Sequence, residues 1–370
     1  MKVVHLTSVH NCEDNRILHK ECVSLVQSGY EVVFIAAGAT ERSVEGVRIR
    51  SVKRANNRLV RMTLTSYLVF RMALTERAEI HHLHDPELLP WGQCLRLMGS
   101  QVIFDMHENL PGAILTKRWL PANCRRVLSF LVGVLERVLL QRLPVIFAEV
   151  SYQRLYPWVR NAVTVLNYPN VNRLENVSRG KCDQFTAGYM GSVEAIRGSV
   201  VTIDALRIFS SLGRQCRLQC VGSLTNAHRI ELESRLSDDD KHRITFHGWK
   251  SPDAGWAIMA QCHVGLAILQ EAPNYVESYP TKLFEYMALG LPVVASNFRL
   301  YREIVERHEC GLCVDPSNPV AVAEALLYLA ENATIAAAMG QRGRSAVRDH
   351  FSWSQQAEKL IAFYRDITRH

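Results

Sequence analysis

The sequence lacks a hydrophobic run long enough to cross a membrane. The longest apolar helical stretch, residues 127–140, is interrupted by Glu136 and Arg137 and is shorter than the roughly 20 residues that a bilayer requires. Residues 1–6 read as a short apolar strand, without the longer apolar region and cleavage site of a secretory signal. We therefore expect no membrane-spanning segment and no export.

The sequence also lacks a disulfide framework. Its 10 cysteines are scattered through 370 residues, a chain long enough to build its own cores, so they are expected to be reduced and mostly buried. The one CxxC pair, Cys310 with Cys313, has neither a second ligand pair nor the context of a redox motif. We interpret this pair as structural.

Short apolar runs alternate with longer segments of helical period, which is typical of βαβ units and parallel sheets. We expect strands in the first half at residues 3–7, 31–36, 80–83, 102–106, 145–150 and 163–166. A second series is expected at residues 186–190, 217–221, 244–247, 263–269, 292–295 and 312–314. The Pro- and Asn-rich stretch between the two series suits a linker. The sequence thus predicts two Rossmann-like halves, followed by helices at residues 319–330, 335–350 and 353–367.

Glycine is missing from the first strand-to-helix turn, residues 8–15. A dinucleotide-binding Rossmann fold needs glycines there for close approach to a pyrophosphate, so hydride transfer with NAD or FAD is disfavoured. The second half differs, because Gly191 and Ser192 close a strand and Arg197 precedes a helix. Small residues, a cation and a helix start suit an anionic phosphate, although a plain strand-to-helix turn fits equally well.

The most informative stretch is residues 274–296, where Glu277 and Glu285 are separated by seven residues. Pro280 is tolerated at the start of a helix that Gly290 ends, so the first carboxylate lies on a loop and the second on the helix. Carboxylates can accept hydrogen bonds from vicinal sugar hydroxyls, while a helix N-terminus with Lys282 favours a diphosphate.

This stretch resembles the E-x7-E motif of the retaining family-4-type glycosyltransferases of the GT-B fold. The form Ser-Tyr-Pro-Thr-Lys-Leu-Phe-Glu-Tyr-Met is similar to the branch that builds bacterial surface polysaccharides, as are residues 7–21 and 351–354. The resemblance implies an α/β protein with two Rossmann-like domains facing each other across a cleft. Residues 1–172 would bind the acceptor and residues 173–351 the nucleotide-sugar, with a helix at about 352–370 packing back on the first domain.

The resemblance also implies roles for individual residues. Glu277 would contact the transferred sugar and Glu285 the ribose, while Lys282 and the backbone around it would face the diphosphate. Arg197 matches the lysine of the family's usual phosphate-binding pair, whereas Ser192 replaces the arginine of that pair. The implied donor-binding residues are Gly191, Ser192, Arg197, Gly222, Gly248, Thr281, Leu283 and Glu285, with Glu277 and Lys282 counted as catalytic.

In the first half, His107 follows an expected strand, where open α/β sheets place their ligands, and it resembles the family's active-site histidine. Asp14 and Arg16 are expected on the acceptor side. Four polar residues lie within five positions and could suggest a metal site: His81, His82, His84 and Asp85. Alternation along a strand puts His82 on the opposite face from His81, and the family needs no divalent metal, so we expect neither a metal nor another cofactor.

The predicted function is therefore a retaining, metal-independent transfer of sugar from a nucleotide-sugar to a lipid-linked saccharide in polysaccharide biosynthesis. Two alternatives stay open: a nucleotide-sugar epimerase of the same fold, and a non-catalytic partner in a polysaccharide assembly complex.

Acidic residues are scarce in the first half. Residues 1–180 hold 23 Lys and Arg against 15 Asp and Glu, and residues 46–75 hold seven basic residues and no acidic one. A second basic group, Lys117, Arg118, Arg125 and Arg126, precedes the apolar stretch. Basic amphipathic segments suit an anionic membrane surface, and the motifs of nucleic-acid readers are missing. We expect residues 46–75 and 117–142 to meet the membrane, placing a cytoplasmic protein at the inner face of the plasma membrane, with no nucleic-acid partner.

Overall fold

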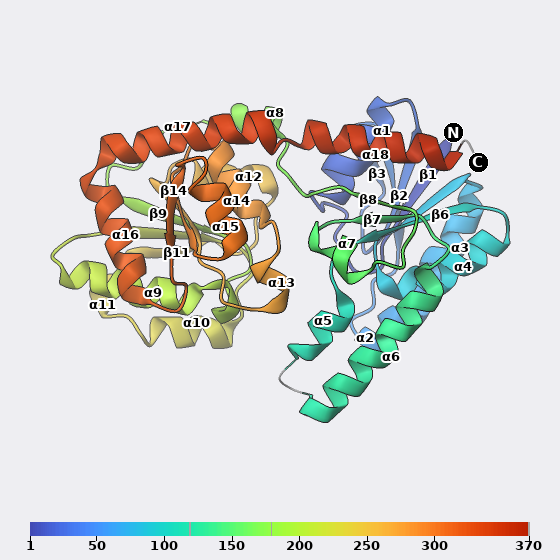
Figure 1. Ribbon diagram of the computed structural model, residues 1–370, viewed down its shortest axis with the longest axis horizontal. Helices are drawn as coiled ribbons and strands as arrows, with labels where there is room; N and C mark the ends of the chain where they lie inside the picture. The colour runs from blue at the N-terminus through green and yellow to red at the C-terminus, as the bar shows by residue number, and fades with distance from the viewer. Residues whose placement is uncertain (118–119, 179, 369–370) are drawn as a thin grey trace. The chain divides into compact units, whose positions relative to one another are not determined.

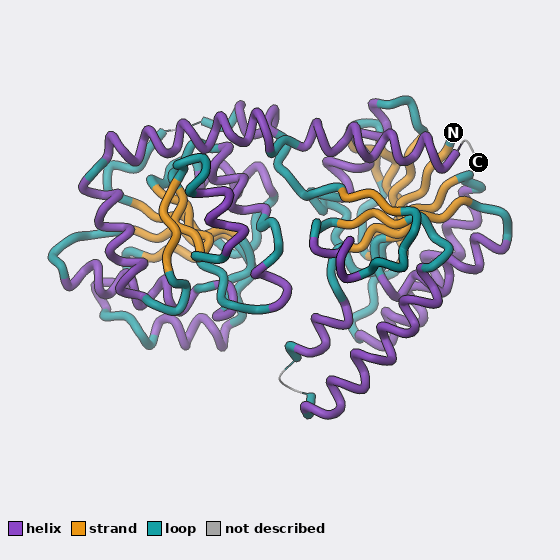
Figure 2. Tube along the Cα trace, viewed as in Figure 1, coloured by secondary structure: helices purple, strands orange, loops and turns teal. Residues whose placement is uncertain are grey.

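The computed structural model describes residues 1–117, 120–178 and 180–368, so Arg118 of the second basic group lies outside the described residues. The chain divides into two compact units, one made of Met1–Asn167 with Trp353–His370 and the other of Tyr168–Ser352. Both units are α/β, with strands at the centre and helices around them (Figures 1 and 2).

The first unit is built on an eight-stranded sheet in the order β3-β4-β2-β1-β5-β6-β7-β8. Neighbouring strands run parallel, except that β3 is antiparallel to β4. The strands are β1 (Lys2–Leu6), β2 (Glu31–Ala37), β3 (Arg42–Val44), β4 (Val47–Val52), β5 (Ile80–Leu83), β6 (Gln101–Met106), β7 (Val145–Phe147) and β8 (Ala162–Thr164). The predicted strands of this half are present, and β3 and β4 are additional.

Helices cover both faces of this sheet because its central strands are apolar on both sides. The helical segments are η1 (Ile17–Cys22), α1 (Val23–Gln27), α2 (Arg58–Val60), η2 (Arg61–Thr65), α3 (Ser66–Glu76), η3 (Pro86–Leu88), α4 (Leu89–Leu97), α5 (Leu110–Leu115), α6 (Ala122–Leu140), α7 (Ser151–Leu155) and α18 (Trp353–Thr368). Helix α18 packs with η1, α1 and β8, while α3 and α4 pack on the other face. The Trp353 indole donates to Ser24 Oγ at 2.9 Å, which ties the C-terminal helix to this unit.

The second unit is built on a six-stranded parallel sheet in the order β11-β10-β9-β12-β13-β14. Its strands are β9 (Thr186–Met190), β10 (Arg217–Val221), β11 (Ile244–Phe246), β12 (Val264–Ala267), β13 (Val293–Ser296) and β14 (Gly311–Val314). Its helical segments are α8 (Val171–Glu175), η4 (Ala195–Arg197), α9 (Ser199–Ser211), α10 (Asn226–Glu233), α11 (Asp238–Lys241), α12 (Pro252–Met259), α13 (Pro273–Val276), α14 (Thr281–Ala288), α15 (Arg299–Val305), α16 (Pro319–Glu331) and α17 (Ala333–His350). The three predicted C-terminal helices are α16, α17 and α18.

Across the described ranges of the chain, no single helix is both long and apolar enough to cross a membrane. The bent combination of α16 with α17 and α18 passes the same test by length and composition alone. The apolar side of α16 lies in the core of the second unit, where Val322, Leu326 and Leu329 are buried.

Candidate active site

In the second unit, three glycine-containing loops meet at the carboxyl ends of the strands. Gly191 N donates to Val221 O at 2.9 Å, and Gly222 N donates to Gly248 O at the same distance. A Cβ on Gly222 would lie 1.9 Å from the carbonyl oxygen of Gly191, so only glycine permits this approach. The structure thus brings together Gly191, Gly222 and Gly248, three of the predicted donor-binding positions.

Helix α14 places Lys282 in its first turn, against the end of β9. The lysine is 7% exposed, and its Nζ lies 4.5 Å above the ring of Tyr189 without a hydrogen-bond partner. Burial, and then the positive charge of Arg197, lower the pKa of Lys282 to about 7. A buried ammonium without an anionic partner is costly, so the site favours a ligand that carries negative charge.

Arg197 lies at the end of η4, just before α9. Its Nε is buried without a hydrogen-bond partner, its side chain lies 4.0 Å from Glu194, and its guanidinium lies over the ring of Tyr275. The side chain of Ser192 is bonded to that of Ser223 at 3.2 Å. The structure therefore supplies two cations, Arg197 and Lys282, and a hydroxyl at Ser192 that is held by Ser223.

Glu285 lies in the second turn of α14 and is buried. It accepts a hydrogen bond from Trp256 Nε1 at 3.1 Å. The next residue, Tyr286, accepts a bond from the amide of Met190 at 2.7 Å, which fixes α14 to the end of β9. Trp256 and Tyr286 were not predicted, because their spacing in the sequence carries no signal of this contact.

The other predicted residues of this motif differ in their surroundings. Glu277 is exposed and follows α13, and Thr281 is half-buried at the start of α14. Leu283 was predicted to bind the donor. Its side chain is fully buried in the core and so does not face a ligand, and its amide donates to Pro280 O at 2.9 Å.

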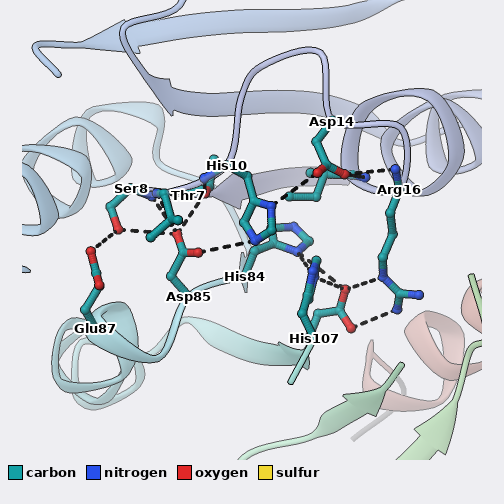
Figure 3. Close-up of polar contacts among 12 residues, drawn as sticks. Thr7, Ser8, His10, Asp14, Arg16, His84, Asp85, Glu87 and His107 are labelled. Carbon is teal, nitrogen blue, oxygen red and sulfur yellow. Dashed lines mark hydrogen bonds and ion pairs between the residues drawn. The ribbon is translucent and has the colours of Figure 1, made fainter. Parts of the chain in front are cut away.

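In the first unit, a second polar cluster lies at the carboxyl ends of β1, β5 and β6 (Figure 3). Asp105, on β6, bonds to Arg16 through Nε at 3.0 Å and through a terminal nitrogen at 2.9 Å. His107 Nε2 lies 2.8 Å from Asp105 Oδ2. Because residues two apart on a strand share a face, the Asp105–His107 pair could have been found from the sequence.

Arg16 corrects one prediction. It is 4% exposed, and besides Asp105 it bonds to Val165 O and pairs with Glu21 at 2.9 Å. Because the Arg16 guanidinium is buried and its contacts with Asp105, Val165 and Glu21 all lie inside the unit, it is not exposed to an acceptor and instead orients Asp105.

Asp14 lies at the edge of the same cluster. It caps η1 by accepting bonds from the amides of Arg16 and Ile17, and its other oxygen lies 3.2 Å from His10 Nδ1. His10 also pairs with Asp85 at 3.5 Å. Although burial opposes it, the hydrogen bond and charge of Asp14 raise the pKa of His10 to about 9, so an imidazolium stands at this edge at neutral pH.

Among the residues that the structure describes, two groups of side chains are close enough to share a metal ion: His5, Glu21, His82 and His84, and His84, Asp105 and His107. As alternation predicts, His81 lies on the other face of β5 and belongs to neither group. The donor set of the second group fits a metal poorly, because both oxygens of Asp105 are bonded to the buried Arg16 guanidinium. A divalent ion there would compete with the Arg16 guanidinium for the same two carboxylate oxygens and would lie close to its positive charge.

Comparison with known proteins places these features in context. Residues 184–332 match the family described as Glycosyl transferases group 1. The chain is 29% identical over 215 residues to a phosphatidyl-myo-inositol mannosyltransferase of Mycobacterium leprae, covering 56% of this chain and 54% of that protein. It is 25% identical over 187 residues to the capsular polysaccharide biosynthesis glycosyltransferase CapM of Staphylococcus aureus, covering 50% and 47%. The chain spans about half the length of the curated relatives it matches.

Solved structures are similar over the whole chain. Sucrose-phosphate synthase from Thermosynechococcus elongatus gives a TM-score of 0.77 at 17% identity, covering 100% of this chain and 99% of that one. Anabaena HepE in complex with UDP and glucose gives 0.74 at 14% identity, covering 99% and 100%. This likeness confirms the predicted fold class.

Proposed function

Because residues 184–332 form a glycosyl transferases group 1 domain and the chain has the GT-B fold, we propose that the protein transfers a sugar from a nucleotide-sugar donor. The observation that carries this proposal is the buried ammonium of Lys282, which has no hydrogen-bond partner and lies close to Arg197, beside the contact of Gly222 with Gly191 that only glycine at position 222 permits. Solved relatives hold UDP and UDP-glucose, and a diphosphate supplies the negative charge that this arrangement lacks.

The donor would be held by groups from three places in the second unit. Lys282, Arg197 and the amides at the start of α14 would contact the diphosphate, since a helix N-terminus and cations both favour a phosphate anion. Glu285, held by Trp256, would accept bonds from the ribose hydroxyls. Glu277 would contact the transferred sugar.

The proposed reaction proceeds with retention at the anomeric carbon and without a metal. Negative charge grows on the departing diphosphate as the glycosidic bond breaks, and preorganised cations in a site that excludes water stabilise it strongly. The departing phosphate then takes the proton of the attacking acceptor hydroxyl on the same face of the sugar. Inverted product seen by NMR would refute retention, and transfer abolished by EDTA would refute metal independence.

For the acceptor, we propose a lipid-linked saccharide in the assembly of a polysaccharide or glycolipid. The named relatives act on phosphatidyl-myo-inositol and in capsular polysaccharide biosynthesis, and helix α6 of this chain carries an exposed apolar face. The side chains of Val127, Leu131, Val134 and Val138 follow at helical spacing and are all exposed, together with Leu128, Phe130 and Leu135. In Figure 1 this helix runs beside α5.

We propose that α6, with the basic residues at its start, docks on an anionic membrane, which would hold the protein at the inner face of the plasma membrane. An apolar helix face with flanking Lys and Arg binds such surfaces. The contribution of residues 46–75 is smaller than their charge implies, because Arg48 and Arg50 pair with Glu76, and Arg61 pairs with Glu87. We propose no role in binding nucleic acid.

A thermal-shift screen over UDP-, GDP- and ADP-sugars tests the donor. One of them should stabilise the wild type, and Glu285→Gln and Lys282→Met should lose that shift. Glu324→Gln, an exposed helical glutamate, serves as the matched control and should keep it. A wild type that responds to none of the donors, or a shift unaffected by Glu285→Gln, would refute the assignment.

A further inference from the structure

Three histidines and a glutamate meet inside the first unit. His5 of β1 pairs directly with His82 of β5, and His84 lies on the same face of β5 two residues further on. Glu21 comes from η1, and one ligating atom from each of the four side chains lies within 4.8 Å of the others. All four residues are at most 1% exposed, so this histidine–glutamate group is enclosed by protein.

A π-helical turn directs Glu21 into the core. The amide of Glu21 donates to Arg16 O at 3.0 Å, five residues back, where an α-helix would use the fourth. Such turns are rare and are frequently found at functional sites. The result is a fully buried carboxylate close to the three histidines.

The carboxylate of Glu21 is incompletely compensated. Among the residues that the structure describes, neither of its oxygens has a hydrogen-bond partner. Arg16 Nε lies 2.9 Å from Oε1 but donates its bond to Asp105, whose charge lies close to Glu21. Two buried carboxylates thus share one guanidinium, and a buried charge without full pairing is costly. The group therefore favours a further positive charge beside Glu21, which either a proton or a metal ion would supply.

The arrangement of the imidazoles favours the metal ion. His82 Nδ1 lies 2.6 Å from the Tyr364 hydroxyl of α18, whereas its Nε2 is buried and has no hydrogen-bond partner in the described chain. His5 Nε2 lies 3.4 Å from the same hydroxyl, on the other side of the ring from Nδ1. Each of these two histidines thus has an outer contact at one ring nitrogen.

His84 follows the same pattern. Its Nδ1 lies 3.2 Å from His107 Nε2 and 3.5 Å from Asp105 Oδ2, and its Nε2 lies 2.9 Å from His5 Nδ1. Histidines that bind metals typically have such an outer contact, which orients the ring and sets its tautomer. A proton on Glu21 could serve only one acceptor, whereas a metal ion can bind all four side chains.

We propose that this group binds a structural zinc ion through His5 Nδ1, His82 Nε2, His84 Nε2 and the carboxylate of Glu21. Imidazole nitrogens and carboxylate oxygens are zinc ligands, and four protein ligands with no open position are typical of structural sites. Ligands about 2.0–2.1 Å from a tetrahedral ion lie roughly 3.3 Å from one another. The His5–His84 separation would therefore widen slightly, and the other ligands would move inward.

The proposed ion would link β1, β5 and η1 in the core of the unit. It departs from the expectation that the protein holds no metal. Because its ligands are enclosed, the ion would contact no substrate, and the transfer reaction proposed above would still proceed without a metal at the reacting atoms. Brief treatment with EDTA should leave the ion in place, since an enclosed ion is released on unfolding.

Metal analysis of the untagged wild type by mass spectrometry tests the site. We expect one equivalent of zinc per chain, and X-ray absorption should show only nitrogen and oxygen ligands at about 2.0–2.1 Å. Sulfur ligands would overturn the proposal, because they would place the ion at cysteines. A protein that contains no equivalent of a transition metal, and takes up none when it refolds with zinc, would also overturn it.

Three variants locate the ion. His82→Leu should lose at least about nine-tenths of the zinc. The matched control is His81→Leu, at the neighbouring buried position on the other face of β5, which should keep it. His107→Gln should keep it as well. Loss of zinc in His107→Gln would overturn the proposal by placing the ion beside Asp105, and full retention in His82→Leu would overturn it too.

Refolding of the wild type gives an answer even if His82→Leu fails to fold. The chain is unfolded in guanidinium chloride with EDTA, freed of both, and refolded with or without one equivalent of zinc. The zinc-loaded protein should melt about 5 °C or more above the metal-free one, because the ion binds the folded state. Equal melting temperatures, or the same rise with magnesium, would overturn the proposal. Sugar transfer enters none of these measurements, so the proposed function can fail separately.

Discussion

Trp256 Nε1 and Glu285 Oε1 are joined by a hydrogen bond of 3.1 Å, and both side chains are buried. The tryptophan comes from α12 and the glutamate from α14, so the bond ties together two helices on the same side of the second sheet. It holds the carboxylate in one orientation before any donor arrives. Preorganisation of this kind lowers the cost of binding.

Replacing Trp256 by phenylalanine should weaken donor binding about five- to tenfold. The variant removes the indole N–H that bonds the buried carboxylate of Glu285, and the loss of this hydrogen bond costs about 1–3 kcal/mol. Part of that cost should appear as weaker binding of the nucleotide-sugar, because the carboxylate loses its orientation. Calorimetric titration with the donor found in the screen measures the change. Trp249→Phe, at a tryptophan that is largely exposed, is the control. Equal affinities in the two variants would contradict the prediction.

The affinity for the donor should fall as the pH rises from 7 to 9. The pKa of Lys282 in the free protein is about 7, and a bound diphosphate would raise it, so binding takes up a proton once the free lysine is neutral. The expected loss approaches about tenfold per pH unit. Calorimetry in buffers of different ionisation enthalpy measures the number of protons taken up on binding. The ligand should be a nucleotide-sugar, because it has no terminal phosphate that titrates in this pH range. Lys282→Met should bind weakly with a flat profile, unlike the exposed Lys250→Met, and a flat profile in the wild type would refute the prediction.

Much of the fold follows from the sequence because buried parallel strands are continuous apolar runs. The predicted strands 186–190 and 217–221 agree with β9 and β10 to the residue. Strand β4 was missed because Arg48 and Arg50 led us to interpret it as part of a basic run. In the structure Val47 and Ile49 are buried and alternate with Arg48 and Arg50 along the strand, and this alternation of period two was the signal.

The site was predicted only where local sequence determines it. Arg197 and Lys282 lie in a short 3-10 turn and a first helical turn, and Glu285 lies one turn further along the same helix α14, so their chemistry can be read from the local sequence. The pairing of His5 with His82, which are 77 residues apart in the sequence, depends on β1 lying beside β5, and only tertiary packing brings these strands together. Spacing in the sequence does not reveal which parallel strands become neighbours.

The exposed apolar face of α6 should determine membrane binding. Phe130 is 70% exposed, and Phe130→Asp combined with Val134→Asp should abolish co-sedimentation with anionic vesicles, since charges on that face cannot enter the acyl region. Leu97→Asp is the matched control, because Leu97 is 78% exposed on α4 and outside this face. Binding by the wild type should weaken with salt. A wild type that fails to bind anionic vesicles at low salt would contradict the proposal.

Glu136, the acidic residue on the inner side of α6, should make stability depend on pH. Burial raises its pKa to about 7, although Tyr156 donates to it at 3.2 Å. Because the folded-state pKa lies above the unfolded one, the stability contributed by neutral Glu136 is fully present below about pH 4.5 and is lost as the pH rises through 7. Glu136→Gln stays neutral, so it should match the wild type near pH 4.5 and exceed its free energy of unfolding by up to about 3 kcal/mol at pH 8. Denaturant titrations at both pH values measure this, and a variant no more stable than the wild type at pH 8 would contradict it.

Gly198 should tolerate no side chain. It precedes α9 with φ of +85°, and a Cβ there would lie 1.8 Å from the carbonyl oxygen of Ile268. Gly198→Ala must therefore displace either the end of β12 or the start of α9, at a cost of more than about 3 kcal/mol.

Substitution of Gly213 is the control that distinguishes the steric clash at Gly198 from the cost of a positive φ. Its φ is +74°, but a Cβ there meets nothing within 4 Å, so Gly213→Ala should cost only about 1–2 kcal/mol and keep full donor binding. Gly198→Ala should lose the donor-dependent thermal shift as well as stability, because a displacement at Gly198 also moves the adjoining Arg197, at the end of η4, away from Lys282. Equal losses of stability in the two variants would mean that the positive φ alone accounts for the need for glycine at position 198. The close approach of the loop to Ile268 would then have no part in forming the donor site.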